Sequence, residues 1–119
     1  MSIAAAQYSK FMTQVAADGK VFTFTQQDEF LVYRFAEAEV IPFWSSRQRL
    51  LKIQATLPKY QKFEIDEMSV TTFLKQLPRL HKNNIRIGVN WSGKNLIGYD
   101  VSTANLRATL EYALKEIGV

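Results

Sequence analysis

Cysteine is missing from this sequence, and histidine occurs once, at His81. Without cysteine the chain has no disulfide, thiolate metal site or cysteine nucleophile, and it suits a reducing compartment. No apolar run approaches the roughly 20 residues that span a bilayer. The segment from Met1 to Gln7 also lacks the positive charge of a secretion signal. We therefore expect a cytoplasmic protein without a membrane segment.

Residues that commonly build catalytic or metal sites are also sparse. The aspartates and glutamates do not cluster with metal-ligand spacing, and no Gly-x-Ser-x-Gly turn is present to expose a serine nucleophile. His81 stands beside Lys82 near the predicted end of a helix, where surface placement or a favourable contact with the helix C-terminus explains it. The sequence therefore predicts no catalytic residue, metal or cofactor, which argues against an enzyme without excluding one.

The charge of the chain is mildly basic. Its 119 residues fit one domain, 1–119, with a net charge of +4 and a pI of about 9.4. The densest basic stretch runs from Arg47 to Lys62, a pattern typical of a solvated helix face. Weak contact with RNA or phosphate is the alternative interpretation. The glycine–aromatic signature of sheet-based RNA binders is missing, which argues against nucleic acid as a partner.

Hydrophobic periodicity divides the chain into helices and strands. Apolar residues recur with helical spacing in the first segment, which Ser2 can cap. Ser69 and either Ser102 or Thr103 are placed to cap later helices, and Pro78 is expected to break or kink one of them. The predicted helices cover 3–18, 46–57, 70–78 and 103–117, and the predicted strands cover 21–25, 30–35, 40–44, 63–68, 85–91 and 96–101.

The order of these elements, α-βββ-α-β-α-ββ-α, indicates the fold class. Hairpins mixed with separated helices favour an α+β protein, with four helices packed on a mostly antiparallel sheet of about six strands. The first three strands are expected to form an antiparallel meander, because their connections are too short for parallel crossovers. Aromatic residues alternate along these strands, which predicts that they are buried. They are Phe22, Phe24, Tyr33, Phe35 and Phe43.

The segment from Gly88 to Lys94 has the GxxxxGK spacing of a phosphate-binding loop, but its context is wrong. Such a loop needs Ser or Thr next, to bind magnesium, and the next residue is Asn95. It also needs a following helix whose N-terminus holds the phosphates, whereas 96–101 predicts a strand. We therefore interpret the segment as the turn of a hairpin.

The most suggestive pattern is a near-repeat at two predicted strand ends, Trp44-Ser45-Ser46-Arg47 and Trp91-Ser92-Gly93-Lys94. In one interpretation the tryptophans fill the ends of the core and the serines cap or turn the chain. In the other, both ends share a rim where hydroxyls, free helix N–H groups and cations bind an anionic ligand or a partner. The predicted functional surface comprises Trp44, Ser46, Arg47, Asn90, Trp91, Ser92, Lys94 and Asp100.

Three segments also point to a family. They are Val21-Phe22-Thr23-Phe24, Ile41-Pro42-Phe43-Trp44-Ser45-Ser46, and Gly88-Val89-Asn90-Trp91-Ser92-Gly93 followed by Gly98-Tyr99-Asp100. Through them most of the chain resembles a bacterial family known as domain of unknown function 2750. The resemblance implies a small bacterial cytosolic protein, and it assigns no substrate, cofactor or catalytic residue.

Together these observations favour a non-enzymatic domain that binds a protein partner or a small anionic ligand. Two alternatives stay open. A small enzyme acting on an anionic metabolite would need a concave pocket with a carboxylate of raised pKa. A weak nucleic-acid binder would need a continuous basic face and a salt-sensitive affinity. An unpaired strand edge could support a homodimer, although no residue pattern specifies one.

Overall fold

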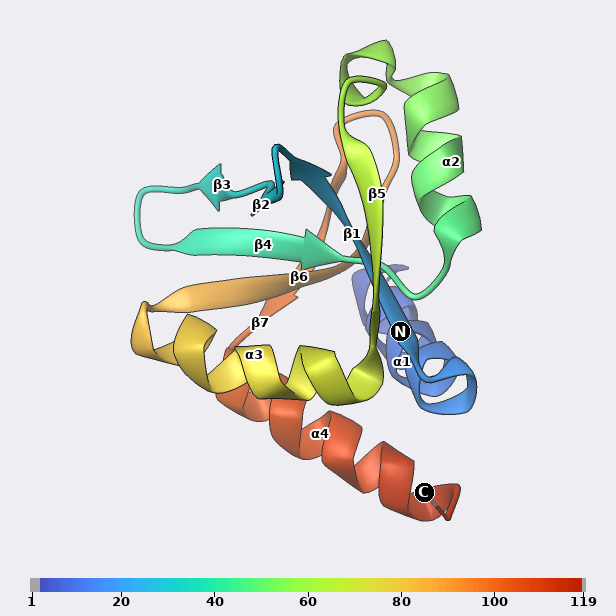
Figure 1. Cartoon of the computed structure of the whole chain (residues 1–119), viewed down its shortest axis with the longest axis vertical. Helices are drawn as coiled ribbons and strands as arrows, with labels where there is room; N and C mark the ends of the chain where they lie inside the picture. The colour runs from blue at the N-terminus through green and yellow to red at the C-terminus, as the bar shows by residue number, and fades with distance from the viewer. Residues whose placement is uncertain (1–2, 119) are drawn as a thin grey trace.

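The structure, a computed structural model, describes residues 3–118, so the predicted cap Ser2 lies outside it. Within this range the elements follow the predicted order, except that one predicted strand is divided in two (Figure 1). The helices are α1 (Ile3–Asp18), α2 (Arg47–Thr56), α3 (Val70–Lys82) and α4 (Thr103–Glu116), and a 3-10 turn, η1 (Pro58–Tyr60), follows α2. The strands are β1 (Lys20–Gln26), β2 (Glu29–Phe30), β3 (Tyr33–Arg34), β4 (Glu39–Phe43), β5 (Glu64–Ser69), β6 (Ile85–Ser92) and β7 (Ile97–Val101).

The strands form two sheets, with the orders β2-β1-β5 and β3-β4-β6-β7. The predicted strand over 30–35 divides between them, because its beginning pairs with β1 and its later part pairs with β4. Reciprocal backbone hydrogen bonds of 2.9 and 2.7 Å between Phe22 and Trp44 join the two sheets at a corner. The α+β class is thus confirmed, whereas the prediction of one sheet of about six strands is wrong.

One strand pair positions the site. β4 and β6 run parallel, with Phe43 opposite Val89, while the other pairings in the described chain are antiparallel. The crossover between them contains α2, β5 and α3, which supplies the length that a parallel connection needs. Because the two strands run in the same direction, Trp44 and Asn90 are the next residues after the last pair of the parallel ladder.

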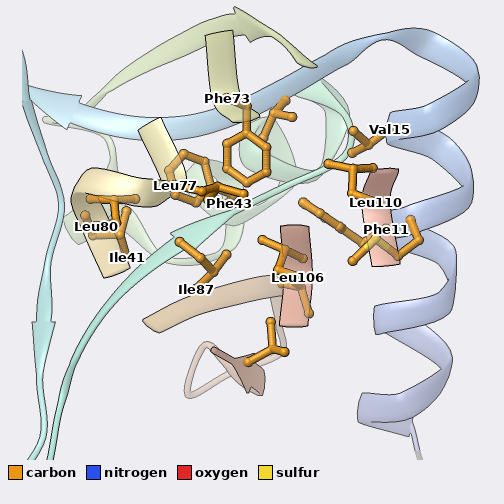
Figure 2. Close-up of a cluster of buried hydrophobic side chains, with 14 of the residues drawn as sticks. Phe11, Val15, Ile41, Phe43, Phe73, Leu77, Leu80, Ile87, Leu106 and Leu110 are labelled. Carbon is orange, nitrogen blue, oxygen red and sulfur yellow. The ribbon is translucent and has the colours of Figure 1, made fainter. Parts of the chain in front are cut away.

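The larger core lies between the second sheet and three helices. Figure 2 shows Phe43 and Ile87 from the sheet pointing toward Phe73 of α3, Phe11 of α1 and Leu106 of α4. These side chains are fully buried, and the Phe43 and Phe73 rings meet edge to face at 4.9 Å. The core therefore fixes α1, α3 and α4 on one face of the sheet.

The smaller core lies between the two sheets and under α2. It contains Phe24, Trp44 and Trp91, with Leu50 and Ile53 of α2 packed against them. Phe24 and Trp44 make an edge-to-face contact at 5.3 Å. This core holds α2 close to the end of β6. In Figure 1 the β6–β7 turn rises behind β5 toward α2.

Local sequence signals explain most of the helix boundaries. The Ser69 and Ser102 hydroxyls accept hydrogen bonds from backbone N–H groups in the first turns of α3 and α4, which confirms both predicted caps. Pro78 does not end α3, because the helix continues to Lys82. Burial was wrongly predicted for Phe35, which lies in the β3–β4 turn and is 56% exposed.

Candidate anion-binding site

The two Trp-Ser segments meet at one end of the second sheet. The indole N–H of Trp44 donates a hydrogen bond of 2.8 Å to the backbone oxygen of Trp91. Beside this bond, the backbone N–H of Ser45, which follows Trp44, donates to the side-chain oxygen of Asn90, which precedes Trp91, at 2.9 Å. The two strand ends therefore lie side by side, as the shared-rim interpretation of the sequence requires. They do so because β4 and β6 are paired in parallel.

A β-bulge sets the direction of the Trp91 side chain. The pairing of β6 with β7 shifts between Val89 and Ser92, and Asn90 has a positive φ of 49°. The extra residue reverses the alternation of faces, so Val89 joins the larger core while Trp91 joins the smaller one. A side chain at Gly88 would stand only 2.5 Å from the Trp91 ring. Because Gly88 has no side chain, the Trp91 indole can pack directly against the backbone at this position.

Both indoles are buried, with exposures of 0% for Trp44 and 4% for Trp91. The Trp91 N–H donates to the backbone oxygen of Tyr99 at 3.0 Å, and the ring meets Tyr33 edge to face at 5.2 Å. An exposed contact anchor is therefore the wrong role for these rings. Trp91 contributes to the lining of the pocket described below, whereas Trp44 lies in the core. The functional role of the predicted surface stays a prediction.

Behind the strand ends lies a small polar cluster. The Ser45 hydroxyl hydrogen-bonds to the Gln14 side chain of α1 and accepts a 3.0 Å hydrogen bond from the Asn90 amide. Ser45 and Asn90 are almost fully buried, and buried polar groups need such partners to offset desolvation. The cluster ties α1, the start of α2 and the bulge of β6 together, which fixes the positions of the elements around the site.

Five predicted surface residues lie outside the pocket described next: Trp44 and Asn90, whose contacts are given above, and Ser46, Arg47 and Asp100. Arg47 pairs with Glu67 of β5 at 3.4 Å and stacks over the Phe22 ring. Asp100 pairs with Arg86 at 2.8 Å. Ser46 is the N-cap of α2, but its side chain makes no capping hydrogen bond. The charges of Arg47 and Asp100 are thus already balanced by partners in the fold.

A pocket of about 470 Å³ opens between α1, α2 and the β6–β7 turn. It includes three predicted residues, Trp91, Ser92 and Lys94, and it adds three that the prediction missed, Gln7, Arg49 and Lys52. Its described lining residues are Gln7, Arg49, Lys52, Ile53, Thr56, Leu57, Trp91, Ser92, Gly93 and Lys94. None of these carries a carboxylate, so the lining has three cationic side chains and no anionic one.

Arg49 is the most constrained of the three cations. It is partly buried, and its guanidinium donates a 3.2 Å hydrogen bond to the neutral side chain of Gln7. Burial lowers the pKa of Arg49, because desolvation penalises the charged form. Among the described residues, none of the ion pairs includes Arg49, Lys52 or Lys94. A desolvated cation without a negative partner is a recurrent feature of ligand sites.

The helical period could have identified the missed cations. Arg49, Lys52, Ile53 and Thr56 stand at i, i+3, i+4 and i+7 of α2, which places them on one face of the helix. The sequence shows that these residues belong to a basic stretch. It does not show which part of the protein lies across from this face of α2. That depends on the β6–β7 turn, which reaches α2 only through the packing of the two sheets.

A second hollow, of about 420 Å³, lies between α3 and α4. Its charges are balanced, because Arg107 pairs with Glu111 at 2.7 Å. His81 lies here on the exposed last turn of α3, with its Nδ1 3.1 Å from the Thr103 hydroxyl. The exposed position predicted for His81 agrees with this placement. The hollow lacks the unbalanced charge that distinguishes the α1–α2 pocket.

Residues 3–118 contain neither a metal-binding cluster nor a helix able to span a membrane. No group of three or more histidine, aspartate or glutamate side chains there could hold a metal ion. No helix in that range combines the length and apolar character that crossing a bilayer requires. The described lining of the α1–α2 pocket therefore consists of cationic, neutral polar and apolar residues.

Fold and site together define a small α+β protein that has two sheets and a cationic pocket close to the corner where the sheets meet. The family model described as a protein of unknown function, DUF2750, matches residues 8–110, and the chain belongs to this family. The match confirms the family resemblance seen in the sequence, and it extends from Tyr8 within α1 to Leu110 within α4. No curated protein shows a significant match to the chain.

Proposed function

We propose that this protein is a binding domain for a small anionic ligand, held in the pocket between α1, α2 and the β6–β7 turn. The observation that carries the proposal is the convergence of Arg49, Lys52 and Lys94 on one pocket whose described lining has no carboxylate. Like charges gathered in a concave, partly desolvated site repel one another, and an anion relieves that repulsion.

The size and composition of the pocket agree with a small molecule. Small-molecule sites commonly have volumes of roughly 300–1,000 Å³, with apolar walls and a few polar groups, and this pocket has about 470 Å³. Ile53, Leu57 and the edge of Trp91 provide the apolar wall. The cations provide orientation, and Arg49 offers a planar fork of donors suited to an oxyanion.

Two features favour binding over the alternatives. General acid–base catalysis commonly uses histidine or a carboxylate, and the described lining of the pocket contains neither. A nucleic-acid binder would need a continuous basic face. Here Arg34, Arg47, Arg86 and Arg107 are each paired with a carboxylate on the surface.

The experiment is a titration of the isotopically labelled protein with sodium phosphate and sodium sulfate, followed by amide and indole NMR signals. We expect saturable shifts at Gly93, Lys94 and the Trp91 indole. The double variant Arg49→Gln/Lys52→Gln should weaken binding at least ~10-fold, because two of the three cations are lost.

The matched control is Lys75→Gln/Lys115→Gln, which removes the same charge from α3 and α4 and should bind like the wild type. Neither lysine lines the pocket. Equal weakening in both double variants would show that net charge alone attracts the anion. Shifts scattered over the surface without saturation would contradict a site altogether.

A further inference from the structure

The charge of the pocket restricts the kind of anion that it can bind. This restriction goes beyond the proposed function and rests on it. A monocarboxylate or a sulfonate carries one negative charge, so it would leave two of the three cations without a partner. A phosphate monoester carries about −1.5 to −2 charges near neutral pH on a single group with three acceptor oxygens. Its charge and its three acceptor oxygens therefore match a pocket lined by the three cations Arg49, Lys52 and Lys94.

The positions of the cations suit one multivalent group. Arg49 and Lys52 are one helical turn apart on the same face of α2, and Lys94 reaches the pocket from the opposite wall, the β6–β7 turn. The Arg49 guanidinium is held by Gln7, so its direction is set before a ligand arrives. Such preorganisation reduces the entropy cost of binding.

The pocket also has an apolar wall beside its cations. Ile53 and Leu57 follow the cationic positions along the chain, and together with Trp91 they form the apolar wall. An ester group of modest size would cover this wall. Diphosphates and triphosphates commonly bind with Mg²⁺, which prefers carboxylate ligands, and the described lining has none.

We infer that the ligand of this pocket is a metal-free phosphate monoester of a small, partly apolar molecule. Its phosphate lies among Arg49, Lys52 and Lys94, and its organic group lies against Ile53, Leu57 and Trp91. Besides the three cations, the described lining offers the organic group the neutral polar side chains of Gln7, Thr56 and Ser92.

Calorimetric titration with matched probes tests this inference. Phenyl phosphate and benzenesulfonate share a ring and a tetrahedral anion, but they differ by nearly one charge near pH 7.5. We expect phenyl phosphate to bind at least ~10-fold more tightly than benzenesulfonate or inorganic phosphate. Lowering the pH to about 5 converts the phosphate to a monoanion, so the phenyl phosphate affinity should fall several-fold while that of benzenesulfonate stays constant.

Each other outcome has a distinct meaning. Equal affinity for benzenesulfonate would overturn the monoester inference and leave the proposed anion-binding function standing. Inorganic phosphate binding as tightly as phenyl phosphate would overturn the role of the apolar wall. If no probe binds, both the inference and the proposed function are wrong. Weaker phenyl phosphate binding by the Arg49→Gln/Lys52→Gln variant, but not by the control Lys75→Gln/Lys115→Gln, would place the ligand in this pocket.

Two further probes separate the sources of the same chemical group. Phosphatidylcholine vesicles containing phosphatidic acid present a phosphate monoester on a membrane, and a single-stranded oligonucleotide presents phosphodiesters. Binding to either one more tightly than to phenyl phosphate would overturn the assignment to a free small molecule. We expect neither to compete with phenyl phosphate in the calorimetric titration.

Discussion

The indole N–H of Trp44 and the backbone oxygen of Trp91 form a buried hydrogen bond of 2.8 Å. It joins the end of β4 to the end of β6 directly behind the pocket. The donor belongs to the residue that begins the connection to α2, and the acceptor belongs to the next-to-last residue of β6, shortly before the turn carrying Lys94. The bond therefore couples the two walls of the proposed site.

The first prediction concerns this bond. Trp44→Phe removes the donor and leaves the Trp91 carbonyl buried without a partner, which should cost about 1–3 kcal/mol in the free energy of unfolding. Urea unfolding monitored by circular dichroism measures it. Tyr112→Phe is the control, because Tyr112 is 66% exposed and its change should stay within about 0.5 kcal/mol. Equal effects of the two variants would contradict the prediction.

The second prediction concerns the space that Gly88 leaves for Trp91. Gly88→Ala places a methyl group 2.5 Å from the indole ring, and such overpacking should destabilise the protein by about 1–3 kcal/mol. In a Trp91→Leu background the ring is gone, so the same glycine substitution should cost less. Chemical denaturation of the four proteins in this double-mutant cycle gives the coupling energy. Additive effects would mean that the ring is not what the methyl group meets.

The third prediction separates the two roles of Asn90, its backbone conformation and its side-chain bonds. Asn90→Gly keeps the positive φ without strain but removes the bonds to Ser45. Asn90→Ala loses the bonds and adds backbone strain of about 1 kcal/mol. We expect both variants to be less stable than wild type in urea unfolding, with alanine the worse of the two. An alanine variant as stable as the glycine variant would show that the bulge conformation costs nothing.

The order of elements could be predicted from the sequence because it depends on local signals. Helical periodicity, the serines before α3 and α4, and the turn around Gly93 are all visible within short windows. The division into two sheets could not be predicted in this way. It depends on which strand pairs with which, and the corner between Phe22 and Trp44 joins residues far apart in the chain.

The candidate site was predictable in part for the same reason. The repeated Trp-Ser pattern identified Trp91, Ser92 and Lys94, which line the pocket. It also named Arg47, which lies outside the pocket and pairs with Glu67 of β5. Arg49 and Lys52 stand close to Arg47 in the sequence, and only the packing of the β6–β7 turn distinguishes their face of α2 from the face of Arg47.

The fourth prediction concerns alkaline stability. Burial, together with the hydrogen bond and the charge of Tyr60, raises the pKa of Tyr33 well above its ordinary value. The folded protein therefore holds this proton more tightly than the unfolded chain. The resulting stability is complete below the ordinary tyrosine pKa of about 10 and is lost as the pH rises from there toward the raised pKa.

We expect the free energy of unfolding to fall less steeply above about pH 10 in Tyr33→Phe than in wild type. Urea unfolding at a series of alkaline pH values measures the two slopes. Tyr112→Phe provides the comparison, since it makes the same substitution at an exposed ring away from the Tyr33–Tyr60 contact. Identical slopes for the wild type and Tyr33→Phe would show that this phenol titrates alike in both states.

The last prediction concerns the cost of gathering cations without a ligand. In the ligand-free protein, Lys52→Gln removes one of three mutually repelling charges in the pocket, so it should raise the free energy of unfolding by about 0.5 kcal/mol at low salt. Lys75→Gln removes the same charge from α3, outside the pocket, and should have a smaller effect. In 0.5 M sodium chloride both differences should vanish, because the screening length falls to about 4 Å. Urea unfolding at both salt concentrations tests this, and a Lys52→Gln variant less stable than Lys75→Gln at low salt would mean that the pocket charges are already compensated within the fold.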